Sequence, residues 1–148
     1  MDCKRALEQA NGDLNKAEEI LRQKGIASAA KKASRATNDG VIESYIHSGG
    51  RIAALVEVNC ETDFVARTAD FKDLAHDIAM QVAAMAPLYV DESEIPEGAD
   101  VSPDEVCLLN QPFIKDPSKT IQELVNEAVG KLGENIRVRR FTRFALGE

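Results

Sequence analysis

The chain has 148 residues, 44% of them hydrophobic and 29% charged, which is the composition of a folded globular protein rather than of a disordered chain. Its formal net charge of −7 argues against broad coating of nucleic acid, because such binding needs Lys and Arg to displace counterions from phosphate. No apolar run approaches the ~20 residues of a membrane-spanning helix, and no hydrophobic signal segment opens the chain, so we expect no membrane partner.

The cysteines and histidines show no metal-binding pattern. Cys3, Cys60 and Cys107 are widely spaced, and neither a CxxC pair nor a Cys/His cluster occurs in the sequence. Free thiols in a reducing compartment are the simpler interpretation. The sequence also lacks a phosphate-binding glycine loop, a dinucleotide-binding glycine pattern and a G-x-S-x-G nucleophile motif. We therefore expect no catalytic residue, no metal and no cofactor.

Residues 1–38 are predicted to form a small helical module. Apolar side chains recur at intervals of three and four up to Leu21, which lines one face of a helix. An Asn-Gly-Asp turn interrupts this face, and the Asp13 carboxylate suits the N-cap of a second helix. Gly25 is placed to end that helix in a left-handed conformation, and an Ala-rich third helical piece follows over 27–33.

The following region, 39–148, is predicted to form an α+β core in which helices pack on a three-stranded antiparallel sheet, because strand and helix patterns do not alternate regularly. Gly49 and Gly50 supply the positive φ that a tight hairpin turn requires. The helices are predicted from apolar side chains at intervals of three and four, and the last strand from imperfect alternation. The expected elements are a hairpin over 41–59, helices over 69–86 and 120–132, and a strand over 136–144.

All five prolines lie in one stretch, residues 87–117. From Pro87 to Ile114 this stretch contains no Lys or Arg, but it carries several Asp and Glu residues. Repeated proline and charge of one sign oppose regular packing, so the stretch 87–117 is predicted to be an acidic surface linker.

The segment between the hairpin and the next helix reads Asn59-Cys60-Glu61-Thr62-Asp63-Phe64-Val65-Ala66-Arg67. Thr62 or Asp63 is the natural N-cap of that helix. Two roles remain open for Phe64. It can staple the helix to the core, which composition alone favours, or it can stand on the loop beside a carboxylate as an anchor for a partner protein.

The main basic cluster lies near the end of the sequence, with two aromatic side chains among its arginines. Basic and aromatic side chains together can bind single-stranded nucleic acid. Strand alternation, however, sends the arginines to one face and most apolar side chains to the other, so we favour a solvated strand face. The residues concerned are Arg137, Arg139, Arg140, Phe141, Arg143 and Phe144.

Several motifs follow one another in a recognisable order along nearly the whole chain. The longest is Glu57-Val58-Asn59-Cys60-Glu61-Thr62-Asp63-Phe64-Val65-Ala66-Arg67. The others are Met1-Asp2-Cys3-Lys4-Arg5-Ala6-Leu7, Ala10-Asn11-Gly12-Asp13, Ile78-Ala79-Met80, Val82-Ala83-Ala84, Gln111-Pro112-Phe113-Ile114, Pro117-Ser118-Lys119-Thr120 and Gly133-Glu134-Asn135-Ile136. Together they resemble the elongation factor Ts family.

The resemblance implies a guanine-nucleotide exchange factor that promotes GDP release from elongation factor Tu during translation elongation. The implied partner is elongation factor Tu in both its GDP-bound and its nucleotide-free form. It implies that the N-terminal module is similar to a ubiquitin-associated domain. The loop with Thr62, Asp63 and Phe64 carries the function in this family: Phe inserts among the partner's helices near its magnesium site, Asp helps to disturb that region, and Thr shapes the loop. Further implied partner contacts are Met1, Cys3, His47, Gly49, Val65, Met80 and Gln81.

The sequence departs from the family pattern in three places. The family's first helix normally precedes the Met-Asp-Cys sequence, so the module is expected to lack that helix. A long helical hairpin normally precedes the Gln-Pro-Phe motif, but here Val106 runs almost directly into it. Gln81 stands where some members have histidine, so a histidine contact is not carried over, and core packing is an equally good role for Met80.

Longer family members hold two related core halves, one with the Thr-Asp-Phe loop and the other with a partner contact at a hairpin tip. This chain carries both features on one core. We therefore expect two chains to pair as a homodimer, so that each contributes a different contact to the partner.

Two other functions remain open. The first is a helical, ubiquitin-associated-type binding module over 1–25, whose binding would survive deletion of everything after Asn38. The second is an RNA-binding protein that uses the C-terminal arginine strand, with affinity that falls steeply with salt. The family resemblance implies no direct nucleic-acid contact and a bacterial-type cytoplasmic location, or an organelle matrix if a presequence has been removed.

Overall fold

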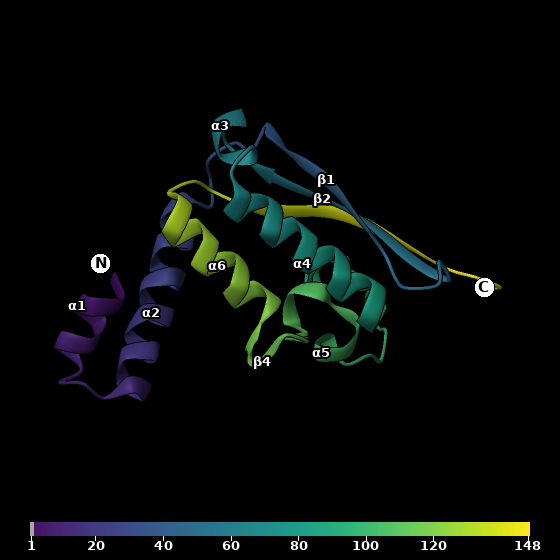
Figure 1. Ribbon diagram of the computed structural model, residues 1–148. Coiled ribbons are helices and arrows are strands. Elements are labelled where there is room, and N and C mark those ends of the chain that lie inside the picture. The colour runs from purple at the N-terminus through teal and green to yellow at the C-terminus, as the bar shows by residue number, and fades with distance from the viewer. Residues whose placement is uncertain (1) are drawn as a thin grey trace.

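The computed structural model describes residues 2–148 and combines helices with a three-stranded antiparallel sheet, which confirms the predicted α+β class (Figure 1). A second, two-stranded sheet joins β3 and β4. The elements in chain order are α1 (Asp2–Gln9), α2 (Leu14–Lys32), β1 (Asp39–Ile46), β2 (Ile52–Cys60), α3 (Asp63–Ala66), α4 (Ala69–Met85), η1 (Glu92–Glu94), α5 (Pro103–Val106), η2 (Leu108–Asn110), β3 (Pro112–Phe113), β4 (Asp116–Thr120), α6 (Ile121–Leu132) and β5 (Arg137–Ala145).

Helix α2 begins where the sequence predicts but does not end at Gly25. The Asp13 carboxylate accepts hydrogen bonds from the backbone N–H groups of Asn15 and Lys16, which confirms the predicted N-cap. The predicted break at Gly25 and the separate Ala-rich helix are wrong. Gly25 is buried, where a Cβ would lie 3.6 Å from the backbone of Asn126 in α6, and the Ala-rich sequence that follows favours continued helix.

The long helix α2 has two different neighbours. Its first half packs with α1 through small buried side chains, among them Ala6 and Ala17. Its second half runs along α6, and Ala29 packs against the main core (Figure 1). Helix α2 therefore packs with α1 inside the region 1–38 and with α6 of the region 39–148. The division of the chain into these two domains stays a prediction.

The main sheet has the order β1-β2-β5, and helix α4 packs against one of its faces (Figure 1). Alternate residues of the central strand β2 point into this interface, where Ala54, Val56 and Val58 are buried. Helix α4 contributes Phe71 and Ile78 to the same core. The hairpin β1–β2 and the strand β5 thus form the sheet that the sequence predicts.

The arginines of β5 do not share one face, so that prediction is wrong. Glu57 of β2 pairs with Arg140, and Val58 pairs with Val138. Arg139 is left between them without a partner in the register, which forms a β-bulge. The bulge resets the alternation of the strand. Arg140 lies on the outer face beside Glu57, whereas Arg143 reaches the end of α4 and donates from Nε to the Ala83 carbonyl at 3.0 Å.

The outer face of the main sheet carries exposed apolar side chains from all three strands. The register places them side by side, because Ile46 pairs with Ala53, Ala53 pairs with Phe144, and Leu55 lies two residues further along β2. We call this surface the outer sheet face. Its exposed large hydrophobic residues are Ile42, Ile46, Leu55 and Phe144.

The stretch 87–117 is not a surface linker throughout, and that part of the prediction is wrong. Its acidic first part is largely exposed, but Cys107, Leu108, Gln111 and Phe113 are buried. Leu108 and Phe113 belong to the main core. The prolines break regular structure into short pieces, yet the apolar residues between them still fold back onto the sheet and helices.

Candidate partner-binding site

The loop after β2 presents an aromatic side chain to solvent. Thr62 caps α3 by accepting a hydrogen bond from the Val65 backbone N–H on its Oγ1 at 3.3 Å. This cap directs Val65 inward, where it is 5% exposed, and leaves Phe64 78% exposed. The core role that composition favours for Phe64 is therefore wrong. Asp63 forms an exposed ion pair with Arg67 at 3.1 Å, one helical turn away.

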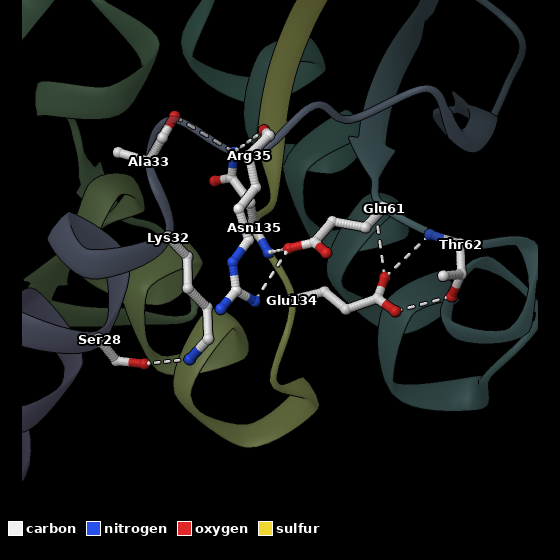
Figure 2. Close-up of polar contacts among 8 residues, drawn as sticks. All are labelled: Ser28, Lys32, Ala33, Arg35, Glu61, Thr62, Glu134 and Asn135. Atoms are coloured by element: carbon white, nitrogen blue, oxygen red, sulfur yellow. Dashed lines mark hydrogen bonds and ion pairs between the residues drawn. The ribbon is translucent and has the colours of Figure 1, made fainter.

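A carboxylate from a distant part of the chain holds the backbone of this loop (Figure 2). Glu134, in the turn between α6 and β5, accepts hydrogen bonds on Oε1 from the backbone N–H groups of Glu61 and Thr62 at 3.1 and 3.0 Å. Its Oε2 accepts from Thr62 Oγ1 at 2.7 Å. The loop is therefore fixed by three hydrogen bonds to an ionised acceptor, which are stronger than bonds between neutral groups.

The contact is reciprocal, because the loop in turn holds the segment that carries Glu134. The Glu61 carboxylate accepts from the Asn135 backbone N–H at 2.7 Å and lies 3.5 Å from Arg35. The Asn135 side chain donates to the Arg35 carbonyl at 2.8 Å (Figure 2). Three segments, from the end of α2, the loop after β2 and the turn after α6, meet at this point.

The buried thiol of Cys60 also forms a hydrogen bond with the backbone of this loop. Its Sγ donates to the Thr62 carbonyl at 3.1 Å. Burial, together with the nearby Glu134 carboxylate, raises the pKa of the Cys60 thiol to about 11. Cys60 therefore remains a neutral donor rather than a reactive thiolate.

The tip of the hairpin lies at the opposite end of the sheet from the Phe64 loop (Figure 1). Gly49 adopts a φ of +91°, as the predicted turn requires, and it is exposed. His47 is also exposed, and its Nδ1 lies 3.1 Å from Tyr45 Oη. One chain thus keeps its two candidate contacts apart.

The other residues predicted to touch a partner lie in different surroundings. Cys3 is exposed on α1, and Met1 lies outside the described residues. Met80 is half-buried on α4. Gln81 is fully buried, and its side chain bonds to Gln111 and to the backbone near it. Neither Gln81 nor the buried Val65 offers a side chain to a partner in this structure.

The basic cluster of β5 is mostly engaged within the chain. Arg139 and Arg140 both face the Glu57 carboxylate, at 3.9 and 2.9 Å. The hydrogen bond from Asn59 and then the contact with Arg140 lower the pKa of Glu57. Arg143 is used at the end of α4. These contacts fit a structural strand face better than a nucleic-acid surface.

Other kinds of site find little support in residues 2–148. Within this range no group of three or more His, Cys, Asp or Glu side chains is arranged to hold a metal ion. Among the same residues, no helix is both long and apolar enough to cross a membrane. The most distinctive surface feature is the exposed Phe64 on a loop fixed by hydrogen bonds. An exposed aromatic on a rigid support is the kind of anchor that protein interfaces use.

The fold is that of a small α+β protein that exposes one aromatic side chain on a hydrogen-bonded loop. Comparison with known proteins gives the family: the model described as Elongation factor TS matches residues 16–101 and 99–148. Elongation factor Ts of Carboxydothermus hydrogenoformans is 52% identical over 178 residues, covering 100% of this chain and 82% of the relative. Those of Moorella thermoacetica and Syntrophomonas wolfei are 48% and 49% identical, covering 100% of this chain and 88% and 83% of theirs. The chain belongs to the elongation factor Ts family.

These alignments also locate a difference from the relatives. Each spans 178 positions, whereas the chain has 148 residues, so at least 30 positions of the relatives have no counterpart here. The two parts of the family match meet at residues 99–101. This place lies within the stretch 87–117, where the sequence predicts that a helical hairpin is absent.

Sequence reasoning missed the residues that hold the loop. The motif Gly133-Glu134-Asn135-Ile136 contributed to the resemblance but received no role. Polar residues after a helix-ending glycine are common in loops, so the Glu-Asn pair carried no signal of its own. Local patterns could not reveal the partners themselves, since 72 residues separate Thr62 from Glu134.

Proposed function

We propose that this protein is a guanine-nucleotide exchange factor for elongation factor Tu, which promotes GDP release during translation elongation in the cytoplasm. It binds its partner without a chemical step of its own. The observation that carries the proposal is the exposed Phe64, with Asp63 beside it, on a loop fixed by Glu134 in a member of the elongation factor Ts family.

Phe64 acts in this mechanism as a wedge. A bound nucleotide and its Mg²⁺ depend on oxygen ligands and backbone amides that tolerate little displacement. An aromatic ring that packs better among the partner's helices in the nucleotide-free arrangement shifts the equilibrium toward that arrangement. Factor and nucleotide then weaken each other's binding by the same factor, and each ~1.4 kcal/mol of coupling changes affinity tenfold.

The test is the release of fluorescent GDP from elongation factor Tu with the unmodified chain, with Phe64→Ala and with Leu88→Ala. Leu88 is exposed like Phe64 but lies far along the chain from the loop. We expect Phe64→Ala to lower the acceleration by ~tenfold or more, as loss of an interface anchor does, and Leu88→Ala to leave it unchanged. Both chains should keep their circular dichroism spectra. Equal release rates with Phe64→Ala and the unmodified chain would contradict the proposed role of Phe64 in GDP release.

We also propose that two copies of this chain pair through the outer sheet face. That face exposes apolar side chains from three adjacent strands, and such patches on folded proteins mark interaction sites. A symmetric pair would bury the face and would give the assembly a second hairpin tip and a second Phe64 loop. One copy could then contact the partner with its loop and the other with its hairpin tip.

Sedimentation at micromolar concentration tests the pairing. We expect a dimer for the unmodified chain and for Leu88→Glu, and a monomer for Leu55→Glu, which places a charge at the centre of the outer sheet face. A monomer that retains full exchange activity would overturn the pairing.

A further inference from the structure

The Phe64 loop is a short segment in which regular structure alone gives little stability. Helix α3 contains only four residues, about one turn, and a single isolated turn is not stable in water. The ring of Phe64 is 78% exposed and therefore gains little packing that could fix it. The orientation of Phe64 in the free protein therefore depends on its neighbours Val65 and Ala66, which are buried in the main core, and on the hydrogen bonds made to the loop from elsewhere.

The principal external contacts come from Glu134. Both of its carboxylate oxygens face the loop, and each is within hydrogen-bond distance of a Thr62 donor, at 3.0 Å for the backbone N–H and 2.7 Å for Oγ1. The same Thr62 Oγ1 accepts from the Val65 N–H in the single turn of α3. Glu134 therefore orients the hydroxyl that caps the helix carrying Phe64 (Figure 2).

Glu134 is itself well placed to act as a fixed support. Gly133, with φ +77°, ends α6 just before it and sets the direction of the chain. Asn135, just after it, is held by Glu61 at 2.7 Å and by the Arg35 carbonyl at 2.8 Å. The carboxylate thus projects from a turn that Gly133 directs and that the Arg35 carbonyl holds, so part of its support lies outside the loop.

We propose that Glu134 is a positioning residue for nucleotide exchange, which holds the Thr62 cap so that Phe64 meets the partner in one orientation. The inference rests on the proposed function of Phe64. Without Glu134 the loop would occupy several orientations, and only a fraction would be competent to bind. The apparent dissociation constant rises by the inverse of that fraction, whereas the rate of GDP release from the complex, once formed, is unchanged.

The test measures GDP release from elongation factor Tu over a range of factor concentrations, with the full chain carrying Glu134→Ala, Glu134→Gln or Glu127→Ala. Glu127 is an exposed carboxylate on α6 that pairs with Lys119 and does not contact the loop. We expect Glu134→Ala to raise the half-saturating concentration ~tenfold with an unchanged maximal rate. Glu134→Gln should recover most of the loss, because its amide oxygen still accepts from the loop N–H groups. Glu127→Ala should behave as the unmodified chain.

Hydrogen exchange of the free chain gives a readout that does not depend on the partner. The backbone N–H groups of Glu61 and Thr62 should exchange faster in Glu134→Ala, while those in the middle of α4 keep their protection. Unchanged protection at the two loop amides would overturn the proposal, and so would an unchanged half-saturating concentration in Glu134→Ala when Phe64→Ala is defective. If Phe64→Ala accelerates GDP release as well as the unmodified chain does, the proposed function fails. Hydrogen exchange at the Glu61 and Thr62 amides then still shows whether Glu134 orders the loop.

Discussion

The side-chain amide of Gln81 donates to Oε1 of Gln111 at 3.2 Å, in a part of the core where the two residues are 0% and 1% exposed. Gln81 also donates to the Pro112 carbonyl at 3.0 Å and accepts from the Ile114 N–H at 3.0 Å. One glutamine in α4 therefore gives hydrogen-bond partners to Gln111, Pro112 and Ile114, inside the proline-rich stretch 87–117. It fastens this irregular segment to the main helix of the core.

Replacement of Gln81 by leucine should destabilise the protein. The substitution keeps a similar side-chain volume but removes the Gln81 partner of the Ile114 N–H, of the Pro112 carbonyl and of Gln111 Oε1. Such orphaned polar groups cost about 1–3 kcal/mol each. We expect a loss of about 2–4 kcal/mol in the free energy of unfolding, measured by urea denaturation. Gln23→Leu, at an exposed position of α2, is the control and should change stability by less than ~0.5 kcal/mol. Similar losses for the two variants would contradict the assigned role of Gln81.

Two glycines should respond in opposite ways to replacement by alanine. At Gly25 a Cβ would be in ordinary van der Waals contact with Asn126, so Gly25→Ala should stabilise the protein by about 0.5–1 kcal/mol through helix propensity. At Gly40, where φ is +152°, a Cβ would lie 2.2 Å from the Val58 carbonyl oxygen. Gly40→Ala should therefore lower the thermal midpoint markedly. A destabilised Gly25→Ala would show that α2 is not continuous at this position.

The three thiols should differ in reactivity. Cys3 is exposed, whereas Cys60 and Cys107 are buried and free. Burial raises the pKa of both buried thiols, that of Cys60 to about 11, so neither forms much thiolate at pH 8. A chromogenic disulfide reagent at pH 8 should label one thiol rapidly in the native chain and all three in urea. Rapid labelling of Cys60 without unfolding would mean that the loop above it opens in the native state.

The carboxylate of Glu57 should stabilise the fold in a pH-dependent way. Its pKa in the folded state is lowered, first by the hydrogen bond from Asn59 and then by Arg140. A carboxylate with a lowered pKa contributes stability above its unfolded value of ~4.3, and this contribution is lost as pH falls through the folded value. Glu57→Gln should therefore lower the thermal midpoint at pH 7, and the difference should shrink below pH ~4. The exposed Glu97→Gln serves as control, and a constant difference across this pH range would contradict the prediction.

Local patterns in the sequence were sufficient for most of the secondary structure. The alternation around Gly49 gave the hairpin, and Asp13 and Thr120 cap helices as their residue types predict. Thr62 caps the short helix α3, whereas the helix predicted to follow it, α4, is capped by Thr68. The errors arose where contacts between distant segments outweighed local preference. Packing on α6 keeps Gly25 helical, and buried apolar side chains hold the segment from Cys107 against the core despite its prolines.

The candidate site was predictable in part. The residue types at 62–64 and the family resemblance singled out the loop, but composition alone favoured a buried Phe64. Only the positions of the Thr62 cap and of Val65 show why the ring points outward. The support from Glu134 depends on a contact across 72 residues, and a single sequence contains no local signal for such a pairing.

The length of strand β2 sets the distance between the hairpin tip and the Phe64 loop. β2 runs from the hairpin turn to the Phe64 loop in nine residues, which at ~3.3 Å per residue separates the two ends by about 30 Å. A single chain that used both ends at once would have to reach two separate regions of its partner. Strand length therefore acts as a spacer: adding two residues to each of β1 and β2 would move the contacts about 7 Å further apart and leave both intact. The separation of the two candidate contacts is thus set by the length of β2, whose core-facing side chains pack against α4.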